Sequence, residues 1–195
     1  MSAFQIPIEH LPPGYAVYGA LYKDTTNAAF LQSQLLARNP EFEYALIDAS
    51  TLLSSAHVLA AVFKAVWAAY KNALKTPNVH SETVLGLSPS FNIAEAYRRY
   101  GIGPESRNVV VIKIITDASK TLAAVEQHVA QKVQGTPVPL TDDAVAACTD
   151  VGKVKKYYKL NGVASLAGGP KSQAAPEKLR EAEVLALGAM ALRGL

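Results

Sequence analysis

Three side chains suited to proton transfer are adjacent at His80, Ser81 and Glu82, near the start of the segment TPNVHSETVLGLSPSFNIAEAYRRYGI (residues 76–102). A carboxylate two residues from a histidine could orient its imidazole, and an oriented imidazole can act as a general base. One hypothesis is therefore a small intracellular enzyme that uses His80 and Glu82. The alternative is structural, because a lone His-x-Glu beside a strand edge more often has no catalytic role.

The rest of the sequence does not complete a mechanism or a metal site. The histidines are scattered, at positions 10, 57, 80 and 128, and none lies at a zinc-like interval from Cys148. Gly101 and Gly103 lack the third glycine and the following helix of a phosphate-binding loop. We therefore expect no catalytic residues, no metal and no cofactor, with Cys148 an inert core thiol.

A second pattern in the same region combines cations with an aromatic ring. Lys75, His80, Arg98, Arg99 and Tyr100 would lie near one another if the turn at 76–78 folds back. Single-stranded nucleic acid is bound by such sets, because cations contact phosphates and flat rings stack on bases. The alternative is that the two arginines form only the solvated side of a short helix.

The composition permits an anionic partner without requiring one. The chain has 195 residues, 50% of them hydrophobic, with a net charge of +3, which is typical of one globular domain with a buried core. The basic run KVKKYYK at 153–159 would form a helix that buries Val154 and one tyrosine and leaves its lysines in solvent. A single cysteine indicates a reducing, intracellular setting, and no apolar run approaches the roughly 20 residues that span a bilayer.

The hydrophobic pattern predicts an α/β (α+β) domain over residues 1–160. Its core would be a mixed, largely antiparallel sheet of about four to five strands flanked by helices. The predicted strands cover residues 4–8, 15–22, 44–48, 83–87 and 109–115. The last of these, VVVIKII, is apolar on both faces and should be central in the sheet.

Capping residues mark the helices that would cover this sheet. The predicted helices begin at Asp24 or Thr25, Ser54 or Ser55, Asn92, about Leu122, Thr141, and Thr149 or Asp150. The second is the longest and should run to about Leu74. The third combines Asn92 with Glu95 and should end at a left-handed Gly101.

Two successive segments after residue 160 differ in composition from the rest of the chain. Residues 161–176 are rich in Gly, Ala, Ser and Pro, which predicts a flexible insertion. Residues 177–195 predict a C-terminal helix that packs back on the domain. Because this helix is apolar around most of its circumference, it needs two neighbours, and one of them could be a partner chain.

Several blocks of the chain, in order, resemble the small kinase-binding subunit of the KEOPS (EKC) complex, the TPRKB-like family. The blocks are Lys75-Thr76, Ser81-Glu82, Leu87-Ser88-Pro89, Asn92-Ile93 and Tyr100-Gly101-Ile102, followed by VVVIKI. Upstream HVLAAVFKAV and downstream KVKKYYKL also fit. The resemblance covers about residues 1–160 and resumes at the last helix.

This resemblance implies a non-catalytic protein that binds the PRPK-type atypical kinase directly and the remaining KEOPS subunits through it, in the nucleus and cytoplasm and away from membranes. The whole assembly makes the threonylcarbamoyl modification of adenosine in tRNA. The implied kinase contact lies on the last helix, at Val184, Leu185, Leu187, Gly188 and Ala191. Some members also hold the 3′ CCA end of tRNA, for which the candidates here are Lys75, His80, Arg98 and Arg99.

Overall fold

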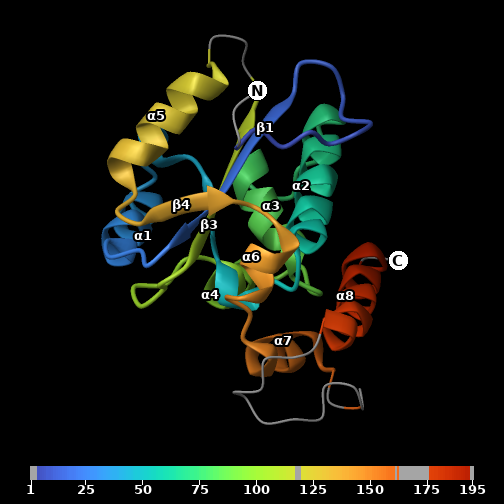
Figure 1. Ribbon diagram of the computed structural model, residues 1–195. Coiled ribbons are helices and arrows are strands. Elements are labelled where there is room, and N and C mark those ends of the chain that lie inside the picture. Colours follow the sequence, from blue (N-terminus) through green and yellow to red (C-terminus); the bar gives the residue numbers. More distant parts are fainter. Residues whose placement is uncertain (1–3, 117–119, 161, 163–175, 194–195) are drawn as a thin grey trace.

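The computed structural model of the protein describes residues 4–116, 120–160, 162 and 176–193. Four strands form one sheet between layers of helices (Figure 1). They are β1 (Ala16–Lys23), β2 (Ala45–Asp48), β3 (Val109–Ile115) and β4 (Thr136–Pro139), in the spatial order β2-β3-β1-β4. All pairings among these strands are antiparallel, so the predicted α+β fold is confirmed and the described strands contain no parallel pair.

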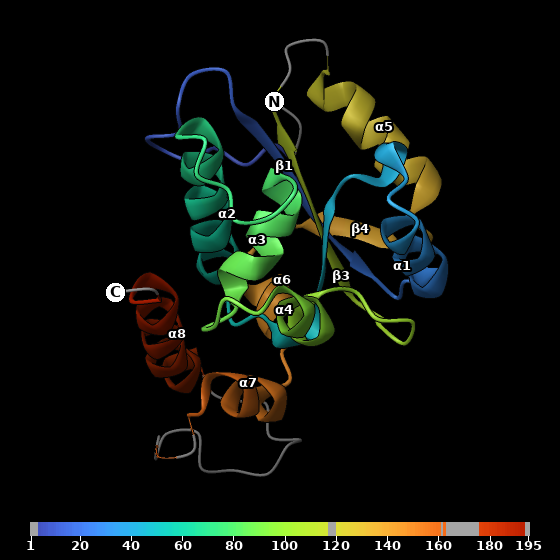
Figure 2. The same cartoon turned by 180° about the vertical axis from the view of Figure 1, so that it is seen from behind.

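Helices cover both faces of this sheet. The α-helices of the described residues are α1 (Ala28–Leu36), α2 (Ser55–Tyr70), α3 (Val79–Leu87), α4 (Ile93–Tyr100), α5 (Leu122–Lys132), α6 (Asp142–Ala146), α7 (Val151–Tyr158) and α8 (Pro176–Ala191). Figures 1 and 2 show α2 and α3 on one face and α1 and α5 on the other, with α4, α6 and α7 towards one end. The two faces therefore carry separate hydrophobic cores.

The central strand β3 supplies side chains to both cores. Val110, Ile112 and Ile114 belong to the core under α2 and α3, whereas Val109 and Val111 belong to the core under α1 and α5. Successive residues of a strand point to opposite faces, so a strand covered on both sides must be apolar throughout. This is the position that the VVVIKII pattern predicts.

The prediction of a strand at 83–87 is wrong, because these residues lie in α3. The Asn78 side chain accepts hydrogen bonds from the backbone N–H groups of His80 and Ser81, and the Ser81 hydroxyl accepts one from the N–H of Asn78. This reciprocal cap starts the helix at Val79, four residues before the predicted strand would begin. All nine residues of α3 are buried, which removes the amphipathic period that would have identified a helix.

Other predicted elements differ at their edges. Residues 4–8 form only an isolated antiparallel bridge between Gln5 and Tyr18 instead of a strand, since Pro7 has no N–H to continue a ladder. The chain also forms β4, which the sequence did not predict because two prolines interrupt it; prolines are tolerated there because β4 is an edge strand. The cap of α1 is Asn27 instead of Asp24 or Thr25.

The predicted caps of three helices are confirmed. Ser54, Asn92 and Asp150 each accept a backbone hydrogen bond three residues ahead, at α2, α4 and α7. Gly101 does follow α4, but its φ of −66° is not left-handed, because the chain turns directly into a bridge with Ile47. A glycine is needed there because a Cβ would lie 2.6 Å from the carbonyl oxygen of Tyr97.

Helix α8 packs against α2 through small and flexible side chains. Ala182, Ala186 and Met190 are buried in the core under α2 and α3. Two polar contacts fix the helix in place: the Ser54 hydroxyl binds the Glu183 carboxylate, and the Lys64 ammonium donates to the carbonyl oxygen of Met190 at 2.7 Å. The predicted flexible insertion at 161–176 lies, apart from its residues 162 and 176, outside the described residues.

Candidate functional site

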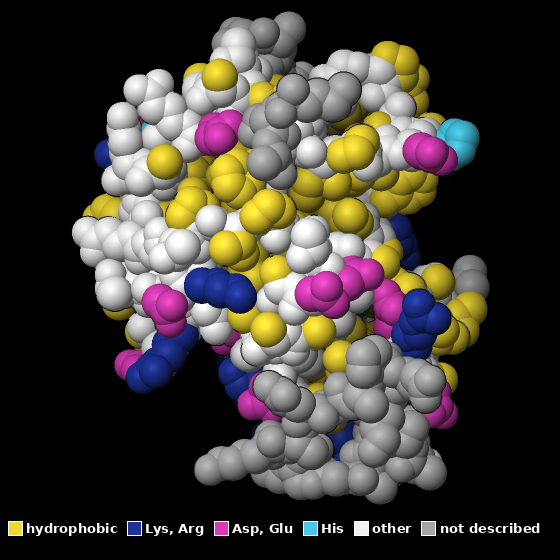
Figure 3. Space-filling view, in the orientation of Figure 1, with side chains coloured by type: hydrophobic (Ala, Val, Ile, Leu, Met, Phe, Trp, Pro, Cys, Tyr) yellow, Lys and Arg dark blue, Asp and Glu magenta, His cyan; other side chains and the backbone are white. Residues whose placement is uncertain are grey.

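The outer face of α8 exposes apolar side chains. Val184 is 69% exposed, Leu185 42% and Leu192, which follows the helix, 65%. Figure 3 shows hydrophobic side chains at the surface along the edge where α8 lies. Ala182, Ala186 and Met190 of the same helix are buried, so the helix presents these apolar side chains from a fixed position.

The five residues predicted to contact a kinase do not share one environment. Val184, Leu185 and Ala191 are exposed, whereas Leu187 is half-buried against the core. Gly188 is half-buried, with no atom within 4 Å of where a Cβ would stand. The exposed part of the predicted contact is therefore centred on Val184 and Leu185.

The end of α8 is also tied to α3. Arg193 donates to the carbonyl oxygens of Leu85 and Ser88, the latter at 2.9 Å, at the C-terminal end of α3, where the Leu85 carbonyl also accepts the N–H of Ser88. Burial lowers the pKa of Arg193, whereas the nearby Glu82 carboxylate raises it. The guanidinium thus caps α3 from the C-terminal end of the chain.

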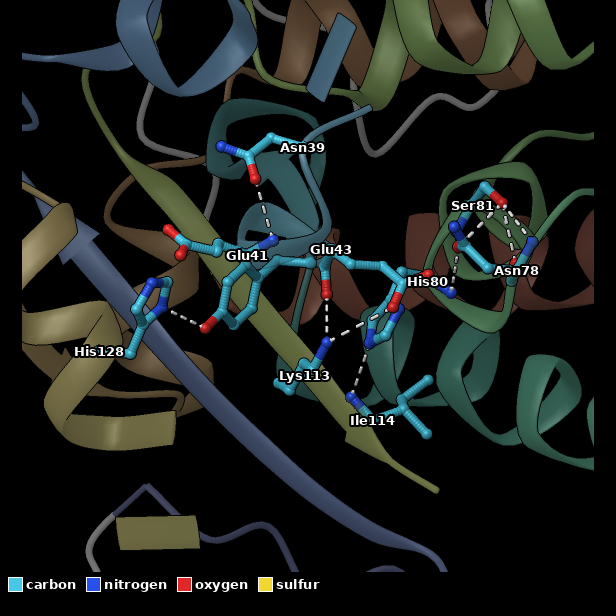
Figure 4. A network of polar contacts seen from close by, with 10 residues as sticks. Asn39, Glu41, Glu43, Asn78, His80, Ser81, Lys113, Ile114 and His128 are labelled. Atoms are coloured by element: carbon cyan, nitrogen blue, oxygen red, sulfur yellow. Dashed lines mark hydrogen bonds and ion pairs between the residues drawn. The ribbon is translucent and has the colours of Figure 1, made fainter. Parts of the chain in front are cut away.

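His80 and Glu82 bind separate partners. The His80 Nε2 accepts a hydrogen bond from the backbone N–H of Ile114 at 3.1 Å, as Figure 4 shows, and burial lowers its pKa to about 3. The Glu82 carboxylate accepts from the N–H groups of Lys75 and Thr76, both at 2.9 Å, and from the Thr76 hydroxyl. Both side chains are buried, so their observed contacts hold a strand edge and a turn and do not form a catalytic pair.

Lys75 lies in a cluster that the sequence did not reveal. Its ammonium is 3.7 Å from the centroid of the Phe91 ring, and the Arg193 guanidinium is 4.8 Å from the same ring. Phe91 is 44% exposed, so part of its ring remains available to solvent. We call Lys75, Phe91 and Arg193 the Phe91 cluster. Residues 75 and 193 are too far apart in sequence for any spacing rule to join them.

The other predicted RNA-binding residues lie apart from this cluster. Arg98 has a 75% exposed side chain with Glu95 at 3.6 Å, whereas Arg99 is bound to Glu95 and stacks at 5.3 Å from the ring centroid of Tyr157. Tyr100 is fully buried and His80 is 3% exposed. Of the four candidates, Lys75 and Arg98 are thus exposed, Lys75 over the ring of Phe91 and Arg98 beside the carboxylate of Glu95.

The described residues show no further site of the kinds considered from the sequence. Among them, no group of three or more histidine, cysteine or acidic side chains could hold a metal ion. Cys148 is half-buried, and burial raises the pKa of its thiol. No helix in these parts of the chain has the length and apolar character needed to cross a membrane.

Comparison with known proteins identifies the family. A family model described as kinase binding protein CGI-121 matches residues 22–194. Proteins named EKC/KEOPS complex subunit CGI121 are similar over the whole chain: that of Neurospora crassa is 45% identical over 208 residues, and that of Gibberella zeae 48% over 200, each covering 100% of both chains. That of Schizosaccharomyces pombe is 32% identical over 76% of this chain and 84% of its own. The resemblance seen in the sequence is confirmed, and the chain belongs to the CGI-121 family of kinase-binding proteins.

Proposed function

We propose that the chain is a non-catalytic subunit of an EKC/KEOPS complex and binds the PRPK-type atypical kinase of that complex through the outer face of α8. The observation that supports this is the set of exposed apolar side chains, Val184, Leu185 and Leu192, on a helix fixed from behind. The kinase would connect the chain to the remaining subunits. The assembly would make threonylcarbamoyladenosine in tRNA.

Replacing Val184 with glutamate tests the proposed kinase contact. A charge that becomes buried and unpaired at an apolar interface costs several kcal/mol. We therefore expect Val184→Glu to weaken binding of the purified kinase at least tenfold in a titration. Leu187→Glu is a less specific test of the contact, because Leu187 is half-buried against the core and a charge there would also disturb folding.

Leu36→Glu is the matched control. Leu36 is 78% exposed on α1, which covers the other face of the sheet (Figure 2), so this change adds the same charge away from α8. We expect kinase affinity to be unchanged by it. Unchanged binding by Val184→Glu, or an equal loss in Leu36→Glu, would remove α8 from the proposed contact.

We also propose that the chain helps to hold the single-stranded 3′ CCA end of tRNA at the Phe91 cluster. The exposed ring could stack on a base, which is worth about 1–3 kcal/mol, and the two cations beside it could contact phosphates. Lys64 lies near both cations of the cluster, because its pKa is lowered by burial and then by the charges of Arg193 and Lys75. This proposal keeps Lys75 from the predicted set and places Arg98 elsewhere.

The RNA proposal is tested by comparing tRNA that has the CCA end with tRNA that lacks it, by fluorescence anisotropy at several salt concentrations. We expect the wild-type chain to prefer the CCA-ended form, Phe91→Ala to weaken that preference about tenfold, and Lys75→Gln to reduce the salt dependence. Arg98→Gln removes the same charge away from the cluster and should leave the preference intact. Equal affinity for both tRNAs would contradict the proposal, and a loss confined to Arg98→Gln would move the site.

Residence in both nucleus and cytoplasm is proposed on the basis of the family resemblance. A fluorescent fusion at the endogenous level should give signal in both compartments. Signal confined to one of them would contradict this part of the proposal.

A further inference from the structure

The strand β2 is shorter than its neighbour β3. The pairing runs from Asp48 opposite Val109 to Ala45 opposite Ile112, and β3 then continues to Ile115 without β2 beside it. At Ile114 a side chain takes the place of a strand partner, because the His80 Nε2 accepts the backbone N–H. The sheet edge beyond Ala45 is thus bounded by α3 instead of by another strand.

A cavity of about 230 Å³ lies at this edge. Its apolar lining includes Leu74, Val79 and Ile115, and its charged lining consists of Glu43, Lys113 and Lys120. At about 30 Å³ for each water molecule, the space would hold roughly eight waters. It is smaller than the roughly 300 Å³ at which sites for drug-sized ligands begin, so it suits a small ligand.

Lys113 is an unusual residue for this place. It interrupts the otherwise apolar β3 and is only 6% exposed. Its ammonium donates to the carbonyl oxygen of Glu43 at 2.5 Å and lies 3.9 Å from the Glu43 carboxylate (Figure 4). Burial lowers its pKa to about 8, which indicates that these contacts do not fully replace water around the charge. A buried lysine that lines a cavity is typical of a binding site.

His80 lines the same cavity and carries a hydrogen-bond donor of its own. Since its Nε2 accepts from Ile114, the proton of the neutral ring is on Nδ1. This Nδ1 is buried and has no hydrogen-bond partner among the described residues. A buried donor without an acceptor is uncommon in folded proteins and suggests that an acceptor is supplied from elsewhere.

We propose that this cavity binds a small oxyanion, either phosphate or a short carboxylate. Two ammonium groups, on Lys113 and Lys120, face one carboxylate, on Glu43, so the lining has a net charge of +1 when both lysines are protonated. Lys120 is exposed and would meet the anion at the mouth, whereas Lys113 and His80 would donate to it inside. This site is independent of the kinase contact on α8.

The test is a calorimetric titration of the full chain at constant ionic strength, in chloride buffer, with inorganic phosphate in one arm and malonate in the other. We expect saturable binding in at least one arm, and the arm that binds identifies the ligand class. Lys120→Gln should weaken anion binding at least fivefold, and Lys113→Met should abolish this binding. Lys156→Gln removes one charge on α7, at the other end of the molecule in Figures 1 and 2, and should leave it unchanged.

Absence of saturable binding in both arms would overturn the proposal. If Lys156→Gln lowers the affinity for the anion as much as Lys120→Gln does, the proposal is also overturned, because the affinity would then depend only on the net charge of the chain. Lys120 is exposed, so its replacement gives a result even where the buried Lys113→Met variant does not fold.

Discussion

In helices α3 and α8, the burial of the side chains is the opposite of what their residue types suggest. The α3 segment contains His80, Ser81 and Glu82, yet all nine of its residues are buried and the three side chains bind backbone and neighbouring groups. The α8 segment carries plain apolar residues, yet Val184 and Leu185 remain at the surface. The comparison teaches that solvent access, and not the chemical character of a side chain, separates the residues that hold this fold from those free to bind a partner.

The largest expected effect is the loss of folding stability at low pH that the buried histidines cause. It tests whether the polar side chains of α3 and of its neighbour α2 have a structural role. Burial lowers the pKa of His57 to about 4 and that of His80 to about 3 from 6.5. Between these values and pH 6.5 the unfolded chain binds more protons, so stability is full above pH 6.5 and falls as the pH drops. We expect a loss of about 2 kcal/mol per histidine between pH 7 and pH 5.

Urea unfolding at the two pH values measures this loss. His57→Gln is the comparison variant, since it removes one of the two titrating groups and should reduce the pH dependence by about half. A wild-type stability that stays constant between pH 7 and pH 5 would show that these rings are not buried neutral.

The next effect concerns Glu82. Glu82→Ala leaves three donors of the turn at Lys75 and Thr76 without their acceptor, which should reduce the free energy of unfolding by about 3 kcal/mol. Glu82→Gln keeps one oxygen in place and should cost less. Denaturant unfolding checks both variants. If Glu82→Ala instead folds normally and loses an enzymatic turnover, the assignment of α3 to structure is wrong.

A smaller effect on stability is expected from Arg193, which follows α8 and binds the end of α3. Arg193→Met removes the hydrogen bonds to Leu85 and Ser88 and should lower stability by about 1–2 kcal/mol. Arg193→Lys should keep part of this stability, because an ammonium can still donate to one of the two carbonyl oxygens. Melting temperatures of the two variants give the comparison, and equal values for Arg193→Met and wild type would mean that α3 needs no cap from this residue.

The smallest effect is expected on the surface of α8. Val184→Glu places a charge where the side chain is 69% exposed, so the free energy of unfolding should change by less than about 0.5 kcal/mol. The same variant should lose kinase affinity if the proposed contact is correct. A large loss of stability would show instead that the outer face of α8 is covered within the chain itself.

Local patterns predicted much of the fold. The caps at Ser54, Asn92 and Asp150 and the fully apolar β3 depend on a few neighbouring residues, which is why they could be recognised. The error at α3 arose because burial of the whole helix removed the polar face that shows a helical period. The strand β4 was missed for a different reason, because it contains prolines that only an edge strand accepts.

The candidate sites were less predictable than the fold. Lys75 was recognised, but its partners Phe91 and Arg193 were not, because residues 75, 91 and 193 meet only in the folded chain. His80 was recognised by type, and its buried contact with Ile114 could not be foreseen from spacing. The cavity lining joins Glu43, His80 and Lys113 in the same way.

By itself the sequence determined the fold class, the caps of several helices and the family, since these rest on local composition and on the order of short motifs. The tertiary structure alone decided which polar residues are used inside, which apolar residues of α8 stay outside, and which distant cations surround Phe91. The physical reason is that burial and long-range contact depend on how elements pack, and packing joins residues that no sequence interval relates.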